Sequence, residues 1–148
     1  MVKLAVFASG SGTNFENIVN RINDGTIKNA AVALLVVDKE HAKAIERAKR
    51  LDIPWVYVNP KAFPSKAEYE EEILQYLRKR EVDLIALAGY MRIVSPVLLA
   101  AYPKRIVNLH PAYLPYFPGK QSILDAFNAK VSETGVTLHY LDEGIDTG

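Results

Sequence analysis

Short apolar runs alternate with amphipathic stretches along this chain, and this alternation constrains the fold more than any other feature. Strands are predicted at residues 3–8, 31–37, 55–58, 84–88, 106–110 and 135–141. Helices are predicted between most of them, including a short one after Ser95-Pro96 and another at residues 122–129. Strands that alternate with helices pair in parallel, so we expect an α/β fold, Rossmann-like, with a mostly parallel sheet flanked by helices.

Capping residues are predicted at four of the helix starts, one of them Ser95 ahead of the proline at residue 96. Thr13 with Glu16, and Ser65 with Glu68, have the spacing of a capping box. Asp38 is expected to cap a helix that runs to about residue 51.

The composition is that of an ordinary globular domain. The chain has 148 residues, 49% hydrophobic and 24% charged, so we expect a single domain over residues 1–148. A net charge of +1 gives no reason to expect a nucleic acid or a membrane as partner. The absence of cysteine excludes disulfides, thiolate metal sites and a cysteine nucleophile. The chain starts without the pattern of a signal peptide, which predicts a cytoplasmic location, and its sequence does not indicate an oligomeric state.

Three segments that follow predicted strands are rich in glycine, proline or polar residues. They are residues 9–14, 89–94 and 108–119. Open parallel sheets bind ligands outside the carboxyl ends of their strands. We therefore expect these three segments to form the binding site.

The segment at residues 9–14, Ser-Gly-Ser-Gly-Thr-Asn, joins the first predicted strand to the first helix. Small residues let backbone N–H groups approach an anion, and a helix N-terminus adds a favourable dipole. We expect a phosphate here, although a tight turn that needs glycine only for its geometry would have the same sequence. A dinucleotide site fits less well, because Phe15 occupies the third glycine position of that motif, even though Asp38 could act as its ribose-binding acid. The lysine of the Walker motif is missing, which argues against a nucleoside triphosphatase.

Asn108 and His110 stand at the end of a predicted strand, before a loop rich in proline and aromatic residues. Residues two apart in a strand point the same way, so both side chains are expected on one face. An amide donor beside an imidazole that can carry a proton suits a reaction that builds negative charge on a carbonyl oxygen. A hydrogen-bonded structural role for His110 fits the sequence equally well. His41 is expected on the surface, and a structural role is favoured for His139.

Acidic residues near the end of the chain could partner an imidazole. Asp142, Glu143 and Asp146 all qualify, and their spacing does not choose among them; a solvated turn would have the same composition. No cluster of His, Asp and Glu has the spacing of metal ligands, so no metal is expected.

Four segments together resemble the glycinamide ribonucleotide formyltransferases, the folate-dependent enzymes of purine synthesis. They are residues 9–14, residues 87–96, residues 108–111 with Leu114-Pro115, and residues 141–148. Their order and separation match along essentially the whole chain. The resemblance implies a formyltransferase fold that lacks the family's C-terminal strand and helix, so the strand at residues 135–141 would miss the neighbour that follows Gly148. It also suggests a cis bond between Leu114 and Pro115.

The resemblance also implies roles for individual residues. The ribonucleotide phosphate would be bound by Ser11, Gly12, Thr13 and Asn14. The folate site would be lined by Lys66, Met91, Arg92, Ile93, Val94 and Asn108. The catalytic residues would be Asn108, His110 and Asp146. Lys66 stands where relatives often have an arginine, so it keeps the positive charge without the planar guanidinium.

The implied reaction transfers a formyl group from 10-formyltetrahydrofolate, a co-substrate, to the amine of glycinamide ribonucleotide, with no metal. One alternative is formyltetrahydrofolate hydrolase, which gives the formyl group to water and needs no phosphate site. A methionyl-tRNA formyltransferase would be expected to have a further RNA-contacting domain and a basic surface. A non-catalytic nucleotide-binding module is the alternative from another class of protein.

Overall fold

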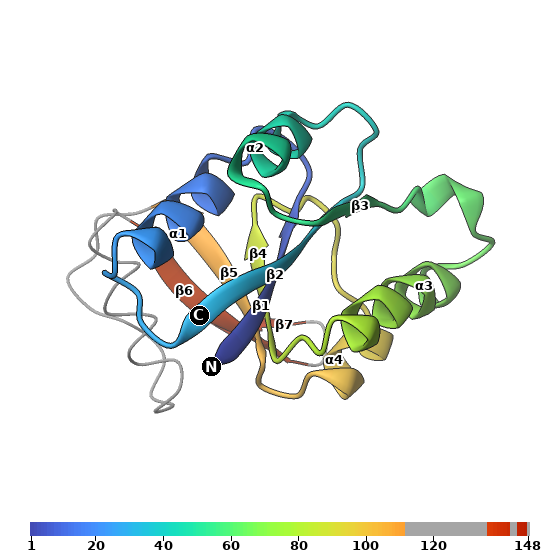
Figure 1. The fold of residues 1–148 in the computed structure, drawn as a ribbon. Helices are drawn as coiled ribbons and strands as arrows, with labels where there is room; N and C mark the ends of the chain where they lie inside the picture. Colours follow the sequence, from blue (N-terminus) through green and yellow to red (C-terminus); the bar gives the residue numbers. More distant parts are fainter. Residues whose placement is uncertain (112–135, 143–144, 148) are drawn as a thin grey trace.

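The computed structural model describes residues 1–111, 136–142 and 145–147 of the chain (Figure 1). Its elements are β1 (Val2–Ala8), α1 (Thr13–Asn23), β2 (Ala30–Val37), α2 (Lys43–Leu51), β3 (Trp55–Tyr57), the 3-10 helix η1 (Pro60–Ala62), α3 (Lys66–Lys79), β4 (Leu84–Ala88), α4 (Pro96–Ala101), β5 (Ile106–Pro111), β6 (Val136–Asp142) and β7 (Ile145–Thr147). All six predicted strands are present, each within one residue of its expected bounds. The helix predicted at residues 122–129 and the cis bond predicted at Leu114–Pro115 lie outside the described residues.

The strands form one sheet in the order β3-β2-β1-β4-β5-β6-β7. The five strands from β3 to β5 pair in parallel, whereas β6 and β7 extend the sheet in antiparallel pairs. The prediction of a mostly parallel α/β sheet is therefore confirmed. Chain order reverses between β1 and β4, which is the point where open sheets of this kind bind ligands.

The strand β6 has neighbours on both sides. Its residues 136–140 pair with β5, and its residues 140–142 pair with residues 145–147 of β7. The expectation that its outer edge lacks a neighbour from within this chain is therefore wrong for residues 140–142. β7 covers that part of the edge because it folds back antiparallel to β6.

Helices cover both faces of the sheet (Figure 1). α1 and α2 pack on one face over Leu4 and Val6 of β1, while α3 and α4 pack on the other over Ala5 and Phe7. Because successive residues of a strand point to opposite faces, a strand covered on both sides must be apolar throughout. This explains why the sequence shows continuous apolar runs rather than alternation in the parallel strands.

The capping box at Ser65 is confirmed in its N-cap half, but the one at Thr13 is wrong. The Ser65 hydroxyl accepts a hydrogen bond from the backbone N–H of Glu68 at 3.2 Å. In α1 the N-cap is Gly12, in the left-handed region at φ 78°, and Thr13 is already the first helical residue. A glycine replaces the expected threonine because the chain turns sharply there, as described below.

The prediction that Asp38 caps α2 is also wrong. α2 begins at Lys43 with Ala42 as its N-cap, and that position makes no side-chain cap. Asp38 instead lies buried just beyond β2, where its carboxylate faces a cation from another loop.

Candidate active site

The loop between β1 and α1, residues 9–12, leaves the carboxyl edge of the sheet at the point where chain order reverses. Its backbone comes so close to α2 that a Cβ on Gly12 would lie 2.7 Å from Cα of Ala44. In the described part of the chain, no hydrogen bond uses the backbone N–H groups of residues 11–14. Free N–H groups at a helix N-terminus form an anion site, so the loop has the form that phosphate binding needs.

Ser9 joins this loop to the segment that follows β4. Its N–H donates to the carbonyl of Gly89 at 3.2 Å, and its hydroxyl accepts from the N–H of Met91 at 2.9 Å. The two segments are held together by these bonds. A ligand at one of them would therefore lie next to the other.

The segment after β4 presents apolar side chains to solvent. Met91 is 80% exposed and Ile93 is 72% exposed, which is unusual for side chains of this size. Val94, between this segment and α4, is buried and packs in the core with Leu98. Of the predicted folate residues, Met91 and Ile93 are accessible to a ligand, and Val94 supports the segment from beneath.

Arg92, in the same segment, faces an acid that sequence reasoning assigned to a helix cap. Its Nε lies 3.5 Å from Oδ2 of Asp38, whose side chain is 2% exposed, and its guanidinium lies 5.7 Å from the ring centroid of Tyr69. Asp38 Oδ1 and Arg92 Nε are buried and, among the described residues, have no hydrogen-bond partner. The carboxylate and the aromatic ring together hold the guanidinium between β2 and α3.

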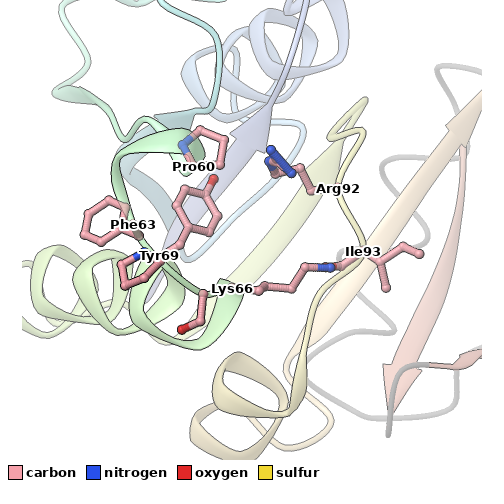
Figure 2. Close-up of a pocket in the computed structure, with 8 residues that line it drawn as sticks. Pro60, Phe63, Lys66, Tyr69, Arg92 and Ile93 are labelled. Carbon is pink, nitrogen blue, oxygen red and sulfur yellow. The ribbon is translucent and has the colours of Figure 1, made fainter.

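A pocket of about 200 Å³ opens beside Arg92. Its lining comes from the start of α3, the segment before it and the segment after β4: Pro60, Phe63, Pro64, Ser65, Lys66, Tyr69, Arg92 and Ile93. Figure 2 shows Lys66 extending from α3 to Ile93, where its Nζ donates to the backbone carbonyl at 3.0 Å. The pocket thus combines aromatic and apolar walls with two cations, which suits a flat ligand that carries a carboxylate.

Two tyrosines hold the wall of this pocket against the sheet. The hydroxyls of Tyr69 and Tyr90 lie 2.7 Å apart, and the Tyr90 ring meets Phe7 of β1 edge-to-face at 5.3 Å between centroids. Burial raises the pKa of Tyr69 to about 12 and raises the pKa of Tyr90 further. Both phenols therefore remain neutral hydrogen-bonding groups at physiological pH.

Asn108 and His110 are placed on β5, the next strand of the sheet. Asn108 is half-buried and pairs with Leu87 of β4 on one side and with His139 of β6 on the other. His110 is opposite Thr137. The prediction that these two residues end a strand at the carboxyl edge is confirmed, and β6 adds His139 at the register position beside Asn108.

Asp146 lies on β7 and is opposite Leu141 of β6. The β6 positions opposite His110 and Asp146 are Thr137 and Leu141, four residues apart, or about 13 Å along a strand. The strand register therefore brings Asn108 and His110 together but places Asp146 further along the sheet. Asp142, an alternative carboxylate, pairs with Ile145 of β7.

Two contacts near this edge of the sheet were not predicted from the sequence. Arg47 of α2 binds the loop after β1, and Glu70 of α3 binds the start of α4. Each contact joins residues from different elements, so no local spacing could have indicated it. His41 is exposed, as predicted.

Within the described ranges, no three His, Asp or Glu side chains group as metal ligands. No helix of that same part of the chain is long and apolar enough to cross a membrane.

The chain matches known proteins over essentially its whole length. Residues 2–148 match the Formyl transferase family. The chain is 51% identical to the phosphoribosylglycinamide formyltransferase of Bacillus subtilis (strain 168), over 100% of this chain and 75% of that protein. It is 36% identical to the phosphoribosylglycinamide formyltransferase of Haemophilus influenzae, over 100% of this chain and 69% of that protein.

Solved structures agree with the sequence relatives. Glycinamide ribonucleotide transformylase 1 from Geobacillus kaustophilus superimposes with a TM-score of 0.80 at 53% identity, covering 100% of this chain and 78% of that one. Identity and structural similarity at this level over the full chain mean a shared fold. By fold and by sequence, this chain belongs to the formyl transferase family.

Proposed function

We propose that this chain transfers a formyl group from 10-formyltetrahydrofolate to the amine of glycinamide ribonucleotide, a step of purine biosynthesis. One observation carries the proposal: the loop with unused N–H groups at the start of α1 and the end of β5 at residues 108–110 lie along one edge of the sheet. This arrangement occurs in a chain that is 51% identical to a phosphoribosylglycinamide formyltransferase. A phosphate-binding loop favours an acceptor that carries a phosphate. A hydrolase, whose acceptor is water, would not need such a loop.

The ribonucleotide would bind with its phosphate at Ser11, Gly12, Thr13 and Asn14. The free N–H groups of these residues and the dipole of α1 support this assignment. The hydrogen bond from the Met91 N–H to the Ser9 hydroxyl holds this loop beside the segment assigned to the folate, so the two substrates would lie next to each other.

The folate would lie along the segment after β4. Met91 and Ile93 offer exposed apolar surface, and Lys66 and Arg92 offer cations to the carboxylates that a folate carries. Val94 would contribute by packing beneath this segment, and Asn108 by its place at the end of β5. Lys66 already donates one hydrogen bond to the backbone carbonyl of Ile93, so it would hold this side of the pocket in place as well as bind the ligand.

The chemistry needs no covalent intermediate with the protein. The free amine attacks the formyl carbon, a C–N bond forms, and negative charge collects on the formyl oxygen. The Asn108 amide and a protonated His110 would donate to that oxygen, each worth about 2.7–4 kcal/mol in comparable sites. Collapse of the intermediate breaks the bond to the folate nitrogen, which takes up the proton that the amine gives away, relayed by His110 or by water.

Asp146 would supply the carboxylate that orients the imidazole and favours its charged form. Asp146 lies on β7, which is separated from His110 on β5 by β6, so its role is tested by a variant of its own. We also propose that residues 1–148 act as one formyltransferase domain on small-molecule substrates in the cytoplasm.

Incubation of the protein with 10-formyltetrahydrofolate tests the proposal, with and without glycinamide ribonucleotide. The expected result is formylated ribonucleotide, detected by mass, and formyl donor consumed only when the ribonucleotide is present. Formate released at the same rate without the ribonucleotide would indicate a hydrolase instead. Binding of both compounds with no turnover would indicate a binding module.

Two histidine variants make the test specific to the proposed site. His110→Ala is expected to lower kcat by about 100-fold or more, as loss of an acid–base group does. His139→Ala, which changes the histidine opposite Asn108, is the matched control and is expected to retain most of the activity. The reverse order of effects would transfer the catalytic role to His139.

A further inference from the structure

Arg47 reaches from α2 to the loop after β1. Its Nε donates to the backbone carbonyl of Ser11 at 2.7 Å, and its Nη1 donates to Oε1 of Glu16 at 2.6 Å. The side chain is 29% exposed, so most of it is held between α1 and α2. One guanidinium therefore binds the loop and the first turn of α1 at once.

The contact with Ser11 sets the orientation of a peptide group. The described residues contain no cis peptide bond, and in a trans peptide the C=O and the following N–H point in opposite directions. Because the Ser11 carbonyl points to Arg47 on α2, the N–H of Gly12 points away from α2. Gly12 donates no hydrogen bond to any described residue, so its N–H is available to a ligand.

Two further contacts hold the same loop on α2. The N–H of Ala44 donates to the carbonyl of Gly10 at 3.1 Å, and Gly12 packs against Ala44 without room for a side chain. The Ser11–Gly12 peptide lies between these points. Without Arg47 it would be fixed at both ends but free to rotate in the middle.

The cluster also controls charge near the loop. Glu16 lies in the first turn of α1, where its carboxylate would repel a phosphate dianion. Arg47 and Arg50 both bind that carboxylate, and these hydrogen bonds lower the pKa of Glu16. Two guanidinium groups and one carboxylate leave the cluster with a net positive charge.

We propose that Arg47 is a positioning residue for the phosphate monoester of the acceptor: it holds the Ser11–Gly12 peptide so that the Gly12 N–H faces the phosphate. The inference rests on the proposed function for the identity of the acceptor. Arg47 lies outside the loop, yet by this contact it sets how tightly the loop binds the phosphate.

Arg50 provides a matched control, because it shares the contact with Glu16 and the charge of Arg47 but does not touch Ser11. Arg47→Met is expected to raise KM for glycinamide ribonucleotide about tenfold, the effect of losing one charge-assisted hydrogen bond at the site. kcat and KM for 10-formyltetrahydrofolate should stay within about twofold, since neither depends on this peptide. Arg50→Met should change KM for the ribonucleotide less than about threefold.

Equal increases of KM in the Arg47→Met and Arg50→Met proteins would show that charge alone matters and would overturn the proposal. So would an unchanged KM in Arg47→Met. If Arg47→Met fails to fold, Arg47→Lys compared with Arg50→Lys makes the same test, because lysine keeps the charge but cannot bind Ser11 and Glu16 in one planar group. The Arg47→Lys protein is then expected to have the higher KM.

A binding measurement separates this inference from the proposed function. Ribose 5-phosphate, titrated calorimetrically without formyl donor, is expected to bind the Arg50→Met protein within about threefold of the wild type and the Arg47→Met protein about tenfold more weakly. If Arg47→Met binds ribose 5-phosphate more weakly but none of the proteins transfers a formyl group, the proposed reaction is contradicted and the role of Arg47 stands. If the proteins transfer the formyl group but bind ribose 5-phosphate with equal affinity, only the role of Arg47 is contradicted.

Discussion

Oδ2 of Asp38 lies 3.5 Å from Nε of Arg92, so the end of β2 holds a cation of the segment that follows β4. The aspartate side chain is 2% exposed and the arginine side chain 33% exposed. A buried carboxylate fixes one side of the guanidinium and leaves the other side toward the pocket beside Tyr69. This ion pair orients Arg92 before any ligand arrives.

We therefore predict that Asp38→Asn weakens folate binding. Without the carboxylate the arginine side chain loses its fixed orientation, and KM for 10-formyltetrahydrofolate should rise about three- to tenfold, with little change for the ribonucleotide. Steady-state kinetics with each substrate varied in turn measures this. Asp52→Asn, the same change at the exposed end of α2, is the control and should leave both KM values unaltered.

A side chain at Gly12 should destabilise the protein and weaken ribonucleotide binding. Gly12 has φ 78°, and a Cβ would lie 2.7 Å from the Ala44 backbone, so Gly12→Ala combines left-handed strain of about 1–2 kcal/mol with a steric clash. Gly25 has φ 84° and open space around it, so Gly25→Ala isolates the strain alone. Denaturant unfolding should show a larger loss for Gly12→Ala than for Gly25→Ala; equal losses would argue against the close approach to α2.

Glu70 should be a major contributor to the stability of α4. Its buried carboxylate accepts from the Ser95 N–H at 2.9 Å, from the Ser95 hydroxyl at 2.5 Å and from the Leu98 N–H at 3.1 Å. Glu70→Ala leaves these donors without their acceptor and should lower the free energy of unfolding by about 2–3 kcal/mol. Glu71→Ala, at the exposed neighbouring position of α3, should cost less than about 0.5 kcal/mol.

The tyrosine pair predicts a loss of stability at alkaline pH. Burial raises the pKa of Tyr69 to about 12 and also raises the pKa of Tyr90, whereas both ionise near pH 10 in the unfolded chain. Between pH 10 and 12 the unfolded state binds fewer protons than the folded state, so the free energy of unfolding should fall as pH rises. In Tyr69→Phe/Tyr90→Phe protein this fall should be smaller, measured against each protein's own stability at pH 7–9.

Asp146 is tested by its effect on the pH dependence of catalysis. Asp146→Asn keeps the shape and removes the charge that would favour imidazolium, so kcat should fall about 100-fold or more and the alkaline limb should move to lower pH. In the His110→Ala background the same change should add little, because members of one catalytic unit are not additive. Near-normal turnover in Asp146→Asn, with a large loss in Asp142→Asn or Glu143→Gln, would assign the role to one of those carboxylates.

The sequence by itself determined the fold class and indicated the edge of the sheet at which the proposed site lies. A short, unbroken apolar run such as Leu84–Ala88 is typical of a strand in a sheet that is covered on both faces. The type and the bounds of such strands therefore follow from the local pattern. The Ser65 cap follows in the same way, since a capping side chain acts within one turn of its own residue.

Only the tertiary structure decided what the polar residues of that edge do. Thr13 and Asp38 have the local pattern of helix caps, yet Gly12 is the cap of α1 and Asp38 binds Arg92. Close packing of α2 on the loop leaves space only for glycine there, and a buried carboxylate must find a cation wherever the fold supplies one. Arg47 belongs to the same class: its contacts with Ser11 and Glu16 join two helices and a loop, and such a relationship exists only once the chain has folded.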